Sequence, residues 1–272
     1  MADVDPITRL HKRRTVLSRG VHVLPSLLTS AALFSGFYSI IYTLNAVLKD
    51  DTNFTPAIYA ILLATVFDSL DGRMARLMRA ETEFGSHFDS IADVVSFGVA
   101  PAVLAYSMAL ADLGRMGWLG AFMFLSCAAI RLARFNVISA TQPSKKYFKG
   151  LSSPVAAGGL AISLLMIRNY VGDKDLGQGL AAAATIFLAL LMVSNARFRS
   201  FKDLDFRRSP TQVFMLAILI IMLIVTFQEV AMFGCFIVYL IAGLVEEMVL
   251  FRRRRKSDPS VPFVPFGDRE QK

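Results

Sequence analysis

Four aspartates lie in two stretches of sequence that are otherwise apolar enough to cross a membrane. Asp68 and Asp71 are three residues apart, and Asp89 and Asp93 are four apart, so each pair shares one face of a helix. A charged side chain in the hydrocarbon region costs about 2.5–3.5 kcal/mol even on insertion scales, so four together need compensation. Protonation, pairing with arginine and binding of a metal ion would each supply it.

The depth of the four side chains favours a shared site. A helix rises about 1.5 Å per residue, so a hairpin that turns near 81–83 places Asp71 and Asp93 at similar distances from the turn. Asp68 then lies about one turn deeper. Carboxylate oxygens suit hard divalent cations such as Mg²⁺ or Mn²⁺, and no histidine or cysteine pattern nearby suggests zinc.

Small residues and one arginine extend the acidic faces. Gly72 and Ala75 continue the face of the first aspartate pair, and Arg76 lies one turn beyond Gly72. Gly85 begins the face of the second pair. Small residues in membrane helices allow close packing of helices, and they also leave room for a ligand, so both interpretations stand.

Composition indicates a membrane protein. Of 272 residues, 55% are apolar and 18% are charged, and the mean hydropathy is +0.53, which excludes an ordinary soluble globular protein. The two cysteines are too few for a disulfide scaffold. A membrane-spanning helix needs about 20 mostly apolar residues. The sequence predicts eight spans, at 24–48, 54–78, 85–111, 116–140, 153–170, 176–196, 211–228 and 230–251.

The distribution of lysine and arginine predicts the orientation. One set of segments outside the spans carries 18 of these residues: 9–19, 145–149, 197–208 and 252–256. The alternate loops carry four: Lys49, Arg115, Arg168 and Lys174. Cytoplasmic loops are enriched in lysine and arginine, so both termini and the hairpin of the aspartates are predicted to face the cytoplasm. The net charge of +8 is then mainly an orientation signal, and we expect no nucleic-acid partner.

The chain divides into five predicted regions. Residues 1–23 form a cytoplasmic juxtamembrane segment, with an amphipathic helix along the inner surface. Residues 24–196 form a six-span core, and 197–210 form a basic cytoplasmic loop. Residues 211–251 add two transmembrane helices, and 252–272 form a basic, disordered cytoplasmic tail.

Eight positions over 26 residues make a specific pattern. It reads Asp68-x2-Asp71-Gly72-x2-Ala75-Arg76-x8-Gly85-x3-Asp89-x3-Asp93. In this pattern the chain resembles the CDP-alcohol phosphatidyltransferase family. The resemblance implies an all-α, six-helix membrane core, a homodimer among membrane lipids, and a site open to the cytosol. It also implies two Mg²⁺ or Mn²⁺ ions.

The resemblance also implies roles for the residues of the pattern. Asp68, Asp71 and Asp89 would bind the metal ions, and Asp93 would be the general base, close to or sharing the second ion. CDP-diacylglycerol would be bound by Gly72, Ala75, Arg76 and Gly85.

Further segments resemble the bacterial, serine-specific branch of the family. They are Asp89-Ser90-x2-Asp93-x3-Phe97-Gly98-x-Ala100-Pro101, Arg131-Leu132-Ala133-Arg134-Phe135-Asn136 and Tyr147-Phe148-Lys149-Gly150-Leu151, followed by Pro154. The branch has proline where Ser152 stands, and asparagine where Ser26 and Ala32 stand. The resemblance implies transfer of a phosphatidyl group from CDP-diacylglycerol to the hydroxyl of L-serine, at the inner membrane of a bacterium.

Two arginines are candidates for the acceptor site. Arg131 and Arg134 are three residues apart on one face of the fourth span. The planar guanidinium suits a serine carboxylate or a lipid phosphate. The alternative is that the two side chains extend to the cytoplasmic interface. Asn136, Lys149 and Ser153 join the serine- and phosphate-binding set by resemblance alone.

Two other functions remain in view. The same family chemistry with another acceptor, such as glycerol 3-phosphate, inositol phosphate or choline, would use the same aspartates. An ion-coupled transporter would place acids near the middle of the membrane, often in repeated halves. All four aspartates lie on one hairpin with no second copy, which disfavours transport.

Overall fold

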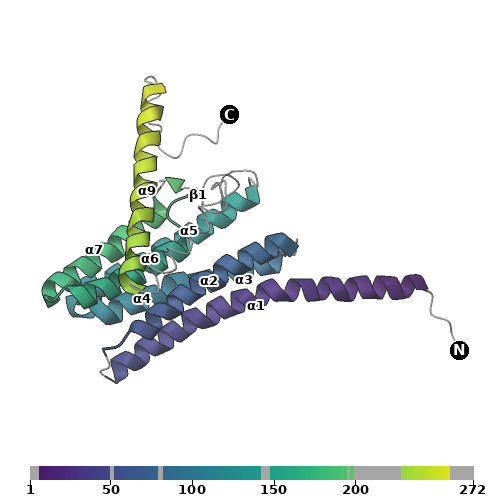
Figure 1. The fold of residues 1–272 in the computed structure, drawn as a ribbon, viewed down its shortest axis with the longest axis horizontal. Coiled ribbons are helices and arrows are strands. Elements are labelled where there is room, and N and C mark those ends of the chain that lie inside the picture. The colour runs from purple at the N-terminus through teal and green to yellow at the C-terminus, as the bar shows by residue number, and fades with distance from the viewer. Residues whose placement is uncertain are drawn as a thin grey trace, which may run out of the picture.

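A computed structural model shows that the described part of the chain is almost entirely helical (Figure 1). It describes residues 6–49, 52–78, 82–141, 148–194, 197–198 and 228–257. The α-helices are α1 (Pro6–Leu48), α2 (Thr55–Met78), α3 (Glu83–Asp93), α4 (Ala100–Ala105), α5 (Arg115–Thr141), α6 (Ser153–Tyr170), α7 (Lys174–Val193) and α9 (Gln228–Ser257). Shorter π and 3₁₀ segments are η1 (Val94–Val99), η2 (Tyr106–Leu110) and η3 (Ala111–Leu113). Two short strands, β1 (Phe148–Lys149) and β2 (Arg197–Phe198), pair antiparallel.

The all-α prediction is confirmed, and seven of the predicted spans coincide with helices. The predicted span 211–228 lies outside the described residues except for its last position, so the number of eight spans stays a prediction. Four helical stretches are long and apolar enough to cross a membrane by length and composition: Ser26–Leu48, Glu83–Leu113, Arg115–Ile138 and Lys174–Val193.

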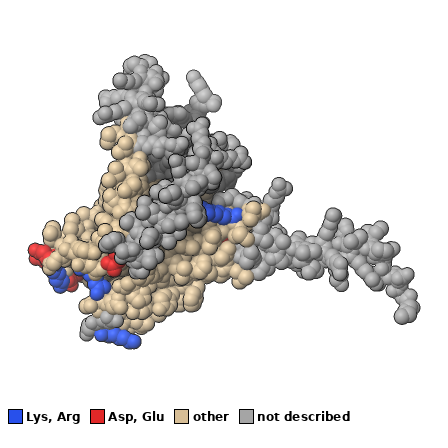
Figure 2. All heavy atoms as spheres, in the orientation of Figure 1, with Lys and Arg blue, Asp and Glu red and all other residues tan. Residues whose placement is uncertain are grey.

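The sides of the bundle present large apolar side chains to the surroundings. Phe34 is 67% exposed on α1, and Phe122 is 59% exposed on α5. Few charged side chains of the described residues appear on the face shown in Figure 2, and several of them gather at one end of the bundle. An apolar belt of this kind is what a helix bundle needs in lipid, so the architecture is that of a polytopic membrane protein.

Two helices cross predicted region boundaries, and the division into five regions stays a prediction. The helix α1 continues through residues 23 and 24, so the N-terminal segment and the first span share one helix. Figure 1 shows the N-terminal segment projecting away from the bundle. The side chains before Ser26 lie outside the described ones. At the other end α9 reaches Ser257, so the predicted disordered tail begins as helix.

The core lies around α6. Its residues from Ala156 to Leu165 are buried, and α6 packs against α2, α4, α7 and α9. The short residues of this stretch let neighbouring helices approach closely, which is the usual means of packing where lipid supplies no hydrophobic driving force. The core therefore centres on the helix that begins at Ser153.

The third span is one continuous helix with two wide turns. The π-helix η1 follows α3 directly, and its Phe97 has no exposed surface. Ser96 donates a hydrogen bond from Oγ to the carbonyl oxygen of Ala32, at 3.1 Å. A Cβ on Gly98 would lie 3.0 Å from the Cδ1 atom of Leu125. These contacts hold η1 between α1 and α5. They therefore also fix the position of Asp89 and Asp93, which precede η1 in the same span.

Gly150 joins β1 to the start of α6. Gly150 follows β1 with a φ of +87°, a conformation that L side chains rarely adopt, and a Cβ there would collide with the carbonyl oxygen of Met192. The backbone N–H of Leu151 donates to the carbonyl oxygen of Leu191, at 3.1 Å. The start of α6 is therefore held against the end of α7.

Candidate active site between α2 and α3

Three of the predicted aspartates converge. Asp68 and Asp71 lie on α2 and Asp89 lies on α3, and a carboxylate oxygen from each lies within 4.8 Å of the others. Asp71 is 5% exposed. The periodicity of two helices predicted this meeting, because each pair shares a face and the hairpin turns the faces toward each other.

Asp93 completes the group. It lies one turn beyond Asp89, at the junction of α3 and η1. Its carboxyl group interacts electrostatically with those of Asp68, Asp89 and Asp71. The structure therefore brings together all four aspartates that the sequence singles out.

A hydroxyl from α1 joins the cluster. Thr29 donates a hydrogen bond from Oγ1 to Oδ2 of Asp71, at 2.9 Å, and Thr29 is itself buried. The aspartate pattern did not predict a role for this residue. The available signal is its spacing, since Thr29, Ala32 and Gly36 follow each other at intervals of three and four and so share the face that packs against the second and third spans.

The cluster has no close cationic partner among the described residues. The one ion pair within this part of the chain joins Lys174 to Asp112, far from the four aspartates. Arg131 on α5 interacts electrostatically with Asp68 and Asp93 without forming a bridge. Several carboxylates without a bridging cation form an oxygen donor set of the kind that hard divalent ions prefer, so the residues fit such an ion.

Arg131 connects the cluster to α6. Its Nη1 atom donates to Oγ of Ser153, at 2.9 Å, and Ser153 has no exposed surface. Its Nε atom is buried and has no hydrogen-bond partner among the described residues. A buried donor without a partner is costly, so the guanidinium has a position ready for a further acceptor.

The remaining acceptor-site candidates differ from Arg131 in their surroundings. Arg134 donates from Nη1 to the carbonyl oxygen of Val193 at the end of α7, at 3.5 Å. Asn136 donates from Nδ2 to Oγ of Ser90, at 2.9 Å, which ties α5 to the aspartate helix α3. Lys149 lies in β1, and its side chain is outside the described ones.

The small residues of the pattern divide into two kinds. Around Gly72 no described atom of another helix lies within 4 Å of where a Cβ would be. Gly85 instead begins α3: its N–H donates to Oγ1 of the N-cap Thr82, at 3.0 Å, and a Cβ would lie 2.9 Å from that oxygen. The side chains of Ala75 and Arg76 are outside the described ones.

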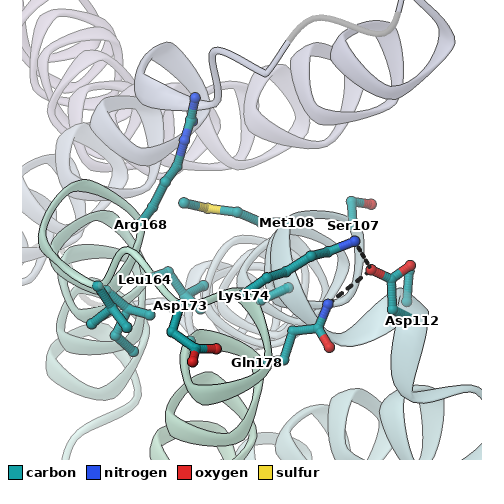
Figure 3. A pocket seen from close by; sticks show the side chains of 13 residues that line it. Ser107, Met108, Asp112, Leu164, Arg168, Asp173, Lys174 and Gln178 are labelled. Atoms are coloured by element: carbon teal, nitrogen blue, oxygen red, sulfur yellow. Dashed lines mark hydrogen bonds and ion pairs between the residues drawn. The ribbon is translucent and has the colours of Figure 1, made fainter.

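A second polar region lies at the opposite end of the third span. Figure 3 shows Lys174 and Gln178 pointing toward Asp112, each 2.8 Å from its Oδ2 atom. Lys174 and Asp112 are 79% and 58% exposed. Asp112 is separated from Asp89 by the length of the span, so this pocket is no part of the aspartate site.

Comparison with known proteins points to one family. The model of the CDP-alcohol phosphatidyltransferase family matches residues 22–194, which include all four aspartates. The chain is 32% identical over 231 residues to the CDP-diacylglycerol–serine O-phosphatidyltransferase of Helicobacter pylori, covering 85% of this chain and 93% of that protein. It is 36% identical over 169 residues to the enzyme of the same name from Mycobacterium leprae, covering 61% and 53%. It is 36% identical over 177 residues to the archaetidylserine synthase of Methanothermobacter thermautotrophicus, covering 64% and 69%.

Proposed function

Because this chain belongs to the CDP-alcohol phosphatidyltransferase family, we propose that it transfers the phosphatidyl group of CDP-diacylglycerol to the hydroxyl of L-serine, giving phosphatidylserine and CMP. The observation that carries the choice of serine is the similarity to the Helicobacter pylori serine enzyme, which spans 93% of that protein. The aspartate cluster supplies the chemical part of the argument.

The family depends on divalent metal ions, and the oxygen donors of this chain fit them. Asp68, Asp71 and Asp89 would hold two ions, Mg²⁺ or Mn²⁺, and Asp93 would share the second. When bound, such ions neutralise phosphate oxygens and stabilise a leaving phosphate. Thr29 keeps the Asp71 carboxylate oriented through its 2.9 Å hydrogen bond.

Asp93 is proposed as the general base. The serine oxygen forms a bond to the phosphorus that carries diacylglycerol, the bond from that phosphorus to the CMP oxygen breaks, and CMP leaves with the electron pair. The hydroxyl proton passes to a carboxylate oxygen of Asp93. The position one turn beyond Asp89 and beside Asp68 supports this role, because a base must reach the proton it takes while the phosphate is held nearby.

Arg131 is proposed to bind the serine carboxylate. It interacts with Asp68 and Asp93, and its buried Nε donor lacks a partner among the described residues. A carboxylate accepts two parallel hydrogen bonds from a guanidinium, which suits this donor. Ser153 orients the guanidinium through Nη1. Arg134 and Lys149 would contribute positive charge nearby, and Asn136 would hold Ser90 and hence α3 in place.

Gly72 is proposed to leave room for the cytidine of the donor, since the space beside it is open. Gly85, Ala75 and Arg76 would border the same donor site, with Arg76 on a phosphate. The backbone N–H of Gly85 also donates to the side chain of Thr82 at the N-cap of α3, so substitution of Gly85 would disturb the start of that helix.

The proposed setting is the inner membrane of a bacterium, with both termini and the site on the cytoplasmic side. Lysine and arginine support this orientation, at 18 residues in one set of segments against four in the other. We also propose a homodimer among membrane lipids, as the family resemblance implies. The other relevant acceptors are glycerol 3-phosphate, inositol phosphate and choline. The gathering of the acids on a single hairpin disfavours an ion-coupled transporter.

An acceptor screen tests the function. Purified protein receives CDP-diacylglycerol, Mg²⁺ or Mn²⁺, and one alcohol at a time, and CMP release is measured. We expect release with L-serine and little with ethanolamine, which lacks the carboxylate. If CMP release is faster with glycerol 3-phosphate, inositol phosphate or choline, that alcohol and not serine is the acceptor. The transfer of a phosphatidyl group from CDP-diacylglycerol would still hold.

A further inference from the structure

The C-terminal helix α9 is fitted into the core of the bundle. Figure 1 shows α9 crossing the other helices and continuing beyond them. It packs against α6, where a Cβ placed on Gly159 would overlap the ring of Phe236. Leu240 is 7% exposed and belongs to the buried core. The glycine of α6 thus receives an aromatic side chain of α9, which fixes the position of α9 along α6.

This contact places a phenol beside Arg131. Tyr239 lies one turn after Phe236 and packs, half-buried, against the core. The Tyr239 hydroxyl and the Arg131 guanidinium interact electrostatically. Asn169 near the end of α6 donates to Glu229 at the start of α9, so α9 runs antiparallel to α6 and Tyr239 lies toward the start of α6, where Arg131 donates to Ser153. The buried Nε atom of Arg131 has no hydrogen-bond partner among the described residues.

We propose that Tyr239 is a positioning residue of the acceptor site, which holds the Arg131 guanidinium in the orientation that receives the carboxylate of the acceptor. The inference rests on the proposed function, since it assigns a carboxylate ligand to Arg131. It gives α9, which lies beyond the region matched by the family model, a part in acceptor recognition. An oxygen that accepts from one edge of a guanidinium leaves the other donors free and limits rotation of the side chain.

The test is the Tyr239→Phe variant of the full-length protein. Phenylalanine keeps the ring and its packing and removes the hydroxyl. We expect the KM for L-serine to rise about tenfold, because the interaction of the hydroxyl with the charged guanidinium is lost. The KM for CDP-diacylglycerol, kcat and Tm should stay close to those of the unchanged protein. Tyr106→Phe is the matched control, since Tyr106 is 36% exposed on η2.

A double-mutant cycle with Arg131→Lys separates positioning from general packing. If Tyr239 acts through the guanidinium, Tyr239→Phe should change the serine KM little once Arg131 is lysine. Full additivity of the two changes would contradict the proposal. An unchanged serine KM in Tyr239→Phe alone would also contradict it. So would a general defect, in which kcat and Tm fall and both KM values rise together.

The outcomes distinguish this inference from the proposed function. If the unchanged protein releases no CMP with serine but does so with an alcohol that lacks a carboxylate, the proposed function and the role of Tyr239 both fail. If the unchanged protein uses serine and Tyr239→Phe behaves identically, only the role of Tyr239 fails.

Discussion

Two acidic regions of this protein differ in how their charge is compensated. Asp112, at one end of the third span, is exposed and has Lys174 and Gln178 at 2.8 Å. Asp71, near the other end, is buried beside further carboxylates and accepts a hydrogen bond from Thr29. Solvent and Lys174 compensate the charge of Asp112. Among the described residues, no lysine or arginine forms an ion pair with the carboxylates around Asp71.

The difference supports the proposal that the buried aspartate cluster, and not Asp112, serves the function. An exposed ion pair contributes little to stability, because solvent screens both charges. Converging buried carboxylates are unfavourable unless something further binds them, so they persist where a ligand is required. The expected effects of disturbing the two regions therefore differ by orders of magnitude.

Removal of divalent ions should give the largest effect. EDTA should abolish CMP release from CDP-diacylglycerol and serine, and excess Mg²⁺ or Mn²⁺ should restore it, because the aspartate cluster would otherwise carry uncompensated charge. The measurement is CMP release before and after chelation. Full turnover in chelator would contradict the assignment of metal ions to Asp68, Asp71 and Asp89.

Replacing a single aspartate should reduce turnover in one acidic region and not in the other. We expect Asp68→Asn or Asp71→Asn to reduce turnover by at least about a hundredfold, because each removes one charged oxygen donor from the metal site. Asp112→Asn, the same change in the exposed region, should leave turnover and Tm nearly unchanged. Equal effects at the two ends would remove the distinction drawn between them.

Within the cluster, Asp93→Asn should affect chemistry more than donor binding. A general base contributes about 10²- to 10⁴-fold, so turnover should fall by that range or more. Binding of CDP-diacylglycerol, measured by calorimetry on the same preparation, should persist because the other three aspartates remain. Loss of donor binding would make Asp93 mainly a metal ligand, and normal turnover would exclude it as the base.

The arginines allow a parallel comparison. Arg131→Ala should raise the KM for L-serine roughly ten- to a hundredfold, the cost of a hydrogen bond between charged groups. It should raise the KM for CDP-diacylglycerol less. Arg168→Ala is the control, since Arg168 is exposed and lies over the Phe54 ring at 5.7 Å, near the Asp112 end. A serine KM that rises equally in both variants would contradict a specific carboxylate contact.

Thr29→Val should give the smallest effect in the cluster. It removes one hydrogen bond to a carboxylate while keeping the shape of the side chain, so the metal concentration for half-maximal activity should rise about tenfold. The control is Ser30→Ala, because Ser30 is exposed and donates only to the carbonyl oxygen of Ser26 on its own helix. A shift of similar size in the control would show that the effect is not specific to Asp71.

The periodicity of the sequence predicted the helices and which of their residues share a face. Asp68 and Asp71 share a face by spacing alone, as do Asp89 and Asp93, and a short hairpin leaves few ways for two faces to meet. The helical class and most spans follow from runs of apolar residues, whose length is set by the membrane. The assigned roles of these residues remain predictions.

Contacts between distant segments were not predicted. Thr29 is 42 residues from Asp71, and its hydroxyl is one of several in α1. Tyr239 interacts electrostatically with Arg131, and α9 lies where it does because Phe236 packs against Gly159. Residue spacing within a helix does not predict such a fit between two helices. The sequence also did not predict that α1 is one helix from Pro6 to Leu48, since charge and hydropathy change near residue 23 while the backbone continues as helix.

The π-helix η1 has an evolutionary consequence. In an α-helix, one inserted residue rotates everything beyond it by about 100°. A wide turn absorbs an extra residue instead, and such turns often lie next to functional sites. Since η1 directly follows Asp93, lineages can gain or lose one residue between 94 and 99 while the acids keep their direction. Between Asp68 and Asp71, where α2 is regular, the same indel would turn one acid away, so selection should tolerate length variation in the first place and remove it in the second.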